Sequence, residues 1–213
     1  MKVKSHPYHH SSGNAFQILF DYLVPFGLLY FYYQFYNFGK ITPSEMIKTT
    51  GLWSIALLSL TLIIGPLCRF FPFLEGLKAH RKVWGIMAFL AGLTHTILVF
   101  ANYFKFNLYR FVDFSNPKYP GIFAGLVALI ILAVVTLTSN KKALTSLSPN
   151  TWKAVQTTVY LALAFAVAHF YLVESVDGVL VIKRVVGQIT FGFAAITILV
   201  RLLVLFFPSK KSK

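Results

Sequence analysis

Two histidines of this sequence lie deep inside long apolar stretches, where an ionisable side chain is costly unless it has a partner. His95 comes about 12 residues into a stretch that begins near residue 83, and His169 about 16 residues into one that begins near residue 153. If both stretches are helices running from the inner to the outer face of a membrane, a rise of about 1.5 Å per residue places the imidazoles roughly 18 and 24 Å from the inner face. We therefore expect both side chains at similar depth, in the outer half of the membrane.

Two imidazoles at matched depth favour a shared ligand, most simply a haem iron with one histidine on each side. Zinc fits less well, because it usually takes a third and a fourth N, S or O ligand, and no acidic residue lies deep in either stretch. Cys68 is the only cysteine, which excludes an intramolecular disulfide and any cysteine-based zinc or iron–sulfur cluster. Alternatively, each histidine is a packed core residue that bonds a neighbouring hydroxyl or carbonyl.

Six apolar stretches must position these side chains, and each is long enough to cross a hydrocarbon layer of about 30 Å. The residues are 57% hydrophobic and 12% charged, with a mean hydropathy of +0.68, which is too apolar for a water-soluble domain. The stretches cover residues 16–36, 48–67, 83–104, 120–138, 153–173 and 185–207, and Pro43, Pro120 and Pro149 stand where helices would begin. The sequence thus predicts an all-α, polytopic membrane helix bundle with six transmembrane helices and no internal repeat.

The basic residues predict the orientation of the bundle. With a cytoplasmic N-terminus, the inside segments carry twelve Lys and Arg residues and the outside segments seven, so both termini are expected in the cytoplasm of a multi-pass inner-membrane protein. The net charge of +14 falls mostly between the apolar stretches, which indicates contact with anionic lipid rather than nucleic acid. We predict a cytoplasmic tail (1–15), one membrane domain (16–207) and a basic cytoplasmic tail (208–213).

An ordered series of short runs carries a further signal. The runs are Gly51-Leu52-Trp53, the segment from Thr61 to Arg69, Arg81-Lys82-Val83-Trp84-Gly85, Lys118-Tyr119-Pro120, Thr138-Ser139, Trp152 and Val159-Tyr160. Together with His95 and His169, this series resembles the MsrQ family, the haem-binding membrane subunits of periplasmic methionine sulfoxide reductase systems. MsrQ belongs to the ferric reductase-like transmembrane superfamily. The order of the runs, rather than any single one, carries the resemblance.

The resemblance implies a haem b electron carrier in which His95 and His169 match the family's iron ligands in the third and fifth helices. Electrons would enter on the cytoplasmic side from a separate flavin reductase or a quinol, with FMN or a quinone as a further cofactor. They would leave to a periplasmic molybdopterin-type reductase subunit like MsrP. The sequence has no domain of its own for a flavin or nicotinamide nucleotide, so a soluble redox partner would be a separate protein.

The inner end of the fifth helix departs from the family pattern. Where a further histidine normally follows Trp152, this sequence has Gln156, and an amide is a poor ligand for haem iron. His80 lies one residue further from His95 than is usual in the superfamily, and it also fits a solvated loop histidine. We therefore expect one haem in the outer half. The residues predicted to contact a flavin, a quinone or haem propionates on the inner side are Arg69, His80, Arg81, Lys82, Trp152, Lys153 and Gln156.

Other functions and pairings stay open at this point. The same fold could deliver electrons to ferric iron or another acceptor, and a haem-free transport or scaffold protein is a further alternative. Asp21 is the only acid deep in an apolar stretch, where it serves a proton or quinone site or lies wetted at the inner interface. Arg201 is expected to extend its side chain towards the cytoplasm or to pair with Asp21.

Overall fold

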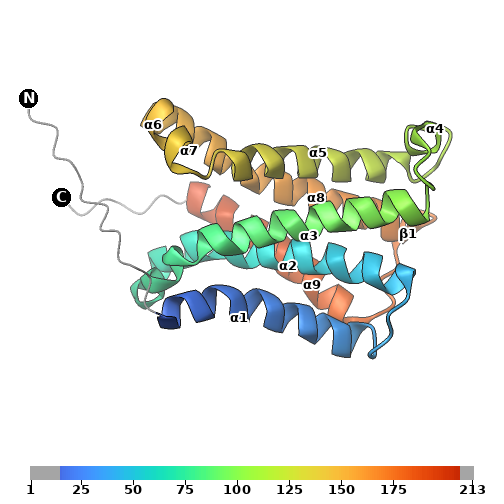
Figure 1. Ribbon diagram of the computed structural model, residues 1–213, viewed down its shortest axis with the longest axis horizontal. Helices are drawn as coiled ribbons and strands as arrows, with labels where there is room; N and C mark the ends of the chain where they lie inside the picture. Colours follow the sequence, from blue (N-terminus) through green and yellow to red (C-terminus); the bar gives the residue numbers. More distant parts are fainter. Residues whose placement is uncertain (1–14, 207–213) are drawn as a thin grey trace, which may run out of the picture.

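The computed structural model describes residues 15–206 as a set of long helices that run up and down beside one another (Figure 1). The helices are α1 (Ala15–Phe31), continued by η1 (Tyr32–Tyr36), then α2 (Pro43–Phe70), η2 (Pro72–Ala79), α3 (Arg81–Asn102), α4 (Leu108–Phe111), α5 (Tyr119–Leu137), α6 (Lys141–Ser146), α7 (Pro149–Thr157), α8 (Val159–Glu174) and α9 (Val185–Phe206). The predicted tails at 1–15 and 208–213 lie outside the described residues, apart from Ala15.

Six helical segments within residues 15–206 are long and apolar enough to cross a membrane, which confirms the predicted class and the number of spans. They are Ala15–Tyr36, Pro43–Phe70, Arg81–Asn102, Tyr119–Leu137, Pro149–Glu174 and Val185–Phe206. The chain is thus a multi-pass membrane protein. α2 begins five residues before the predicted stretch, because Thr42 caps it by accepting a hydrogen bond from the Glu45 amide at 3.3 Å. Hydropathy locates the apolar part of a helix, whereas capping extends the helix beyond it.

A short hairpin is the departure from an all-helical chain within the described residues. Strands β1 (Ser175–Val176) and β2 (Val179–Leu180) pair antiparallel. Asp177 and Gly178 between them have φ angles of 50° and 79°, and two positive φ angles are what a tight two-residue hairpin turn requires. We call the end of the bundle that carries this hairpin the hairpin end. The opposite end, where α1 begins and α9 ends, is the terminal end (Figure 1).

α2 forms the centre of the bundle and packs against α1, α3, α8 and α9. Of its most apolar stretch 72% is buried, against 11–28% for the other five spans. Leu57, Leu58 and Leu62 are almost fully buried. Ser59, also fully buried, donates a hydrogen bond to the Ile55 carbonyl of its own helix at 2.7 Å. Ser54 instead donates to the Ala88 carbonyl of α3 at 2.8 Å. These buried hydroxyl groups of α2 are therefore satisfied by carbonyls of the same or a neighbouring helix, as an apolar surrounding requires.

The long helices form two similar pairs, α2 with α3 and α5 with α8. α2 and α5 both start at the hairpin end, whereas α3 and α8 both start from the terminal end (Figure 1). Pro43 and Pro120 lie in the first turn of α2 and α5, as predicted. Because α3 and α8 run in the same direction, residues the same distance along them reach the same depth.

An ion pair joins three segments at the hairpin end. Arg184, just before α9, donates two hydrogen bonds to Glu45 of α2, at 2.7 and 2.8 Å, and one to the Tyr36 carbonyl at 2.6 Å. Its guanidinium also lies 4.5 Å from the centre of the Tyr36 ring. The hydrogen bonds with the Glu45 carboxylate raise the pKa of Arg184 above its ordinary value. This contact holds the ends of η1, α2 and α9 together.

Replacing Arg184 by Gln should lower the free energy of unfolding by about 2 kcal/mol, because it leaves the mostly buried Glu45 carboxylate without its partner. Thermal unfolding of the detergent-purified protein measures the change. Lys183→Gln, which removes the neighbouring exposed cation, is the matched control and should leave the melting temperature unchanged. Equal melting temperatures for the two variants would show that the ion pair does not hold this end together.

Candidate functional site

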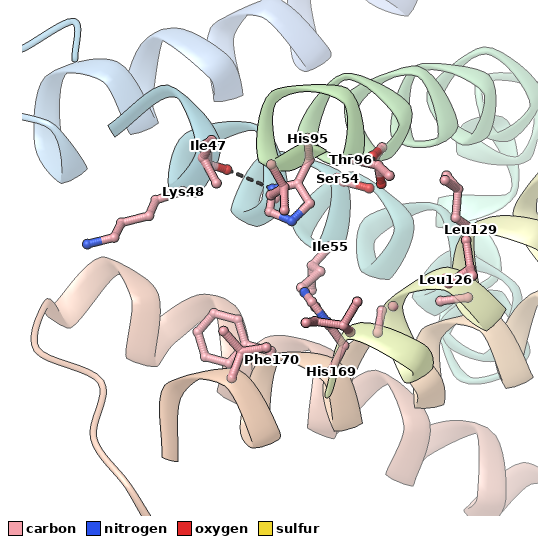
Figure 2. A pocket seen from close by; sticks show the side chains of 18 of the residues that line it. Ile47, Lys48, Ser54, Ile55, His95, Thr96, Leu126, Leu129, His169 and Phe170 are labelled. Carbon is pink, nitrogen blue, oxygen red and sulfur yellow. Dashed lines mark hydrogen bonds between the residues drawn. The ribbon is translucent and has the colours of Figure 1, made fainter. Parts of the chain in front are cut away.

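His95 of α3 and His169 of α8 lie opposite each other between the two helix pairs (Figure 2). Their ring centroids are 6.0 Å apart and the ring planes are inclined by 80°. The prediction that the two side chains reach the same depth is confirmed. Both residues lie in the second half of helices that begin at the terminal end, so the site is in the half of the bundle nearer the hairpin end.

Each imidazole is held by a backbone carbonyl of the neighbouring helix. Nδ1 of His95 donates to the Ile47 carbonyl at 2.8 Å, and Nδ1 of His169 donates to the Gly121 carbonyl at 2.8 Å. A carbonyl only accepts, so the proton of a neutral imidazole is on Nδ1 and Nε2 keeps its lone pair. This is the tautomer that a metal-binding histidine needs.

Two glycines leave room for the rings. A Cβ atom built on Gly51 of α2 would lie 2.9 Å from Nδ1 of His95, and one built on Gly125 of α5 would lie 2.7 Å from Nδ1 of His169. Real Cβ contacts are essentially never that short. Any side chain at either position would push the imidazole off its carbonyl, so each ring packs directly against a glycine.

The two halves of the site repeat at a constant spacing. The accepting carbonyl lies 48 residues before its histidine in both halves. The glycine lies 44 residues before it in both, and an offset of 74 residues relates Gly51 to Gly125 and His95 to His169. The same offset relates Ala88 to Ala162, which are both fully buried. The prediction of no internal repeat did not include this correspondence between the helix pairs, which is limited to a few positions at their contacts.

A cavity of about 530 Å³ surrounds the two histidines, within the range of roughly 300–1,000 Å³ that small-molecule and cofactor sites occupy. Its walls come from the first half of α2, the second half of α3, residues 122–132 of α5 and α8 from Ala166 onward. Most of the lining is apolar, including Leu52, Ile55, Leu126, Leu129, Leu132 and Phe170. The cavity is therefore a mostly apolar slot with two imidazole nitrogens facing it.

The donor set and the slot fit a haem better than a bare metal ion. Within residues 15–206, no group of three or more His, Cys, Asp or Glu side chains is placed to hold a metal ion. A metal between two imidazoles, at nitrogen–metal distances of roughly 2 Å, places the ring centres about 6 Å apart, which matches the observed 6.0 Å. Two imidazole nitrogens facing a mostly apolar cavity fit a haem with two histidine ligands, and the glycines leave room for both rings.

The basic residues predicted to contact a cofactor on the inner side lie at the terminal end and do not line this cavity. Arg81 donates from Nε to the Thr61 carbonyl at 2.9 Å, and Arg69 donates to the Val204 carbonyl at 3.3 Å. Lys82 and Lys153 are exposed. The structure thus separates them from the histidine pair, and their role towards a second cofactor stays a prediction.

His80 is not a solvated loop residue. Its Nδ1 lies 2.7 Å from Asp21 Oδ1, its side chain is 11% exposed, and its ring stacks on Trp84. Of the two alternatives expected for Arg201, the pairing with Asp21 is wrong. Asp21 bonds His80, and the Arg201 guanidinium lies 4.7 Å from the centre of the Tyr160 ring. The packing of α1 against the start of α3, which the sequence does not reveal, decides both pairings.

Trp152 and Gln156 bind the last turn of α5. Trp152 Nε1 donates to the Thr138 carbonyl at 3.1 Å, and Gln156 Nε2 donates to the Val135 carbonyl at 3.2 Å and to Thr138 Oγ1 at 3.1 Å. Ser139 donates to Gln156 Oε1 at 3.3 Å. These bonds satisfy carbonyls that the end of a helix leaves open. In this structure both side chains join α7 to α5.

Gln156→Ala should lower the melting temperature by a few degrees, because it removes three partly buried hydrogen bonds worth about 1 kcal/mol each. The absorption of any haem bound at the histidine pair should not change. A melting curve and an absorption spectrum of the same preparation measure both. If the spectrum changed while the melting temperature did not, Gln156 would have to be assigned to the cofactor site.

Comparison with known proteins gives a consistent result. Residues 50–167 match the family described as ferric reductase like transmembrane component. The heme-binding subunit MsrQ of protein-methionine-sulfoxide reductase from Agrobacterium fabrum is 31% identical over 147 residues, which cover 68% of this chain and 66% of that protein. The MsrQ proteins of Brucella anthropi and Herminiimonas arsenicoxydans are 30% and 29% identical, over 64% and 72% of this chain and 60% and 69% of theirs. The chain therefore spans about two thirds of the length of these relatives.

Proposed function

Since the chain belongs to the family of ferric reductase-like transmembrane components, we propose that it is a membrane electron-transfer subunit that holds one haem b between His95 and His169. It would take electrons from a flavin or quinol on the cytoplasmic side and pass them to a periplasmic reductase of the methionine sulfoxide type. The similar MsrQ proteins are named as heme-binding subunits of a methionine sulfoxide reductase, which supports this choice.

The observation that carries the proposal is the pair of imidazoles with free Nε2 atoms, 6.0 Å apart between centroids. Each is fixed by its Nδ1 bond to a carbonyl, which orients the ring and increases the electron donation from Nε2. The leucines of the cavity give the site a mostly apolar lining. A haem bound there would supply a carrier of single electrons, and the helices would set its ligands and surroundings.

The orientation of the protein belongs to the same proposal. The sequence has twelve Lys and Arg residues in the segments predicted inside, among them Arg69, Arg81, Lys82 and Lys153 at the terminal end, and seven in the segments predicted outside. Such an excess marks the cytoplasmic side of an inner-membrane protein. The hairpin end then faces the periplasm, with the histidine pair in the outer half. His95 lies 14 residues beyond Arg81 on α3, a distance of about 21 Å along the helix. An electron from the cytoplasm therefore needs a second carrier near the terminal end.

A cationic cluster at the terminal end supports a place for that carrier. The Arg201 guanidinium lies over the Tyr160 ring, and the Tyr160 hydroxyl donates to the Leu62 carbonyl at 3.0 Å. Arg81 reaches the same place, because Arg81 Nη1 and the Tyr160 hydroxyl both lie beside Gly65. The described residues include all six acids of the chain, and none of them pairs with either arginine. Unpaired guanidinium groups bind phosphate well. We propose FMN, or a quinone with its polar head at this cluster, as the donor cofactor. Sequence reasoning missed Arg201, because an arginine near a helix end usually only anchors the helix.

A spectrum and a reoxidation assay test this function. The detergent-purified protein should show a low-spin b-type spectrum with about one haem per chain, and the reduced haem should be reoxidised by a periplasmic methionine sulfoxide reductase with its substrate. Ferric citrate is the competing acceptor, because the family description names ferric reductases. Faster reoxidation by ferric citrate than by the reductase would assign the chain to iron reduction. A colourless, folded protein would overturn the electron-transfer function itself.

A further inference from the structure

The cavity is charged at one end only. Its charged lining residues are Lys48, in the second turn of α2, Lys118, just before α5, and Glu174, at the end of α8. All three lie at the hairpin end. Deeper in the cavity the walls are formed by Leu126, Leu129 and Leu132 and similar side chains. The slot therefore has an apolar floor and a polar rim with an excess of one positive charge.

Both lysines keep donors free for a ligand. Lys118 Nζ donates to the Ser175 carbonyl at 2.5 Å, which uses one of its three N–H groups. Lys48 is exposed, and Figure 2 shows its side chain extending from the α2 turn that also carries Ile47, the partner of His95. Within residues 15–206, neither lysine forms a salt bridge with a carboxylate. The ammonium groups thus stand at the rim without an anionic partner.

The shape of a haem matches this distribution of charge. One edge of the porphyrin carries two propionate carboxylates and the other edge carries only small apolar groups. A carboxylate is strongly disfavoured in an apolar slot unless a cation or hydrogen-bond donors compensate its charge. Only the rim offers cations. The arginines and lysines expected from the sequence to hold propionates, such as Arg81 and Lys153, do not line the cavity.

We propose, building on the haem site argued above, that Lys48 and Lys118 bind the haem propionates and fix the orientation of the ring. The propionate edge faces the hairpin end and the apolar edge packs against Leu129 and Leu132. Charge-assisted hydrogen bonds from the two ammonium groups supply the attraction. The carboxylate edge is then the part of the cofactor nearest to an electron acceptor that docks at the hairpin end.

The experiment compares haem with its dimethyl ester, in which both carboxylates are esterified. Both are titrated into the full-length apoprotein in detergent, and the dissociation constants are measured by absorption. The wild-type protein should bind haem at least tenfold more tightly than the ester, because charged hydrogen bonds are lost with the ester. Lys48→Gln and Lys118→Gln should each weaken haem binding several-fold, and the double variant should bind haem and ester equally.

Controls separate this inference from general effects. Lys105→Gln removes a cation of the α3–α4 connection that does not line the cavity, and it should keep the full preference for haem. Lys48→Arg and Lys118→Arg retain the positive charge and should keep most of it. If the double variant still preferred haem as the wild type does, the propionates would lie elsewhere. If the wild-type protein bound neither porphyrin, the haem function would fail, and this orientation with it.

Discussion

His95→Ala and His169→Ala should each abolish the low-spin b-type absorption of the purified protein and reduce bound haem from about one per chain to a small residual fraction. Each imidazole supplies one of two axial nitrogens from its own helix, α3 or α8. No other His, Cys, Asp or Glu of the described chain joins the pair in a metal-binding group, so we expect no side chain of these types to take the place of a lost imidazole. A haem-to-protein ratio and a reduced-minus-oxidised spectrum measure the result.

The matched control for these variants is His80→Ala. His80 is also a mostly buried histidine, but it lies just before α3, bonds Asp21 at the terminal end and does not line the cavity. The variant should be less stable and still carry one low-spin haem. If His80→Ala lost the haem while His169→Ala retained it, the axial pair would have been assigned to the wrong histidines. Retention of low-spin haem in both His95→Ala and His169→Ala would exclude the site altogether.

Gly51→Ala and Gly125→Ala should have nearly as large an effect through a single methyl group. The new Cβ would lie 2.9 or 2.7 Å from Nδ1 of the adjacent histidine, which forces the ring to leave its carbonyl acceptor. We expect loss of most of the haem, or a shift of the remaining haem to a high-spin spectrum as one axial bond is lost. Absorption and electron paramagnetic resonance spectra distinguish the two outcomes.

The loss of haem in these glycine variants can be distinguished from misfolding by the stability of their helices. Alanine is a better helix former than glycine by about 1 kcal/mol, so both variants should form their helices at least as well as the wild type. Gly65→Ala is the control, because a Cβ there meets Arg81 and Tyr160 only at 3.5 Å or more, an ordinary contact distance. It should leave the spectrum unchanged. A wild-type spectrum for Gly51→Ala and Gly125→Ala would mean that the rings are free to move within the site.

The sequence was sufficient for the spans and for the depth of the histidines. A transmembrane helix must satisfy its own backbone hydrogen bonds and present apolar side chains to lipid, so its position follows from local composition. The fixed rise per residue then sets the depth of any side chain along it. This is why the matched depth of His95 and His169 could be predicted before either helix had been placed.

Tertiary structure alone decided which helices meet and what each polar side chain bonds. Each span is apolar on all sides, so it has no amphipathic face that would show which neighbouring helix it contacts. The sequence cannot show that the backbone carbonyls of Ile47 and Gly121 accept these hydrogen bonds, because every residue has a backbone carbonyl. The 74-residue offset that relates Gly51 to Gly125 could have been found in the sequence, but without the contacts it is one coincidence among many.

The same reason accounts for the corrected pairings. The roles of Asp21 and His80 were predicted from the residues next to each of them in the sequence. In the structure the two side chains bond each other, although they are 59 residues apart in the chain. Gln156 could be recognised as a departure from the family pattern, but its bonds to the end of α5 could not. Local composition therefore determined where each helix lies in the membrane. Contacts between residues far apart in the chain, which depend on how the helices pack, determined the surroundings of each histidine.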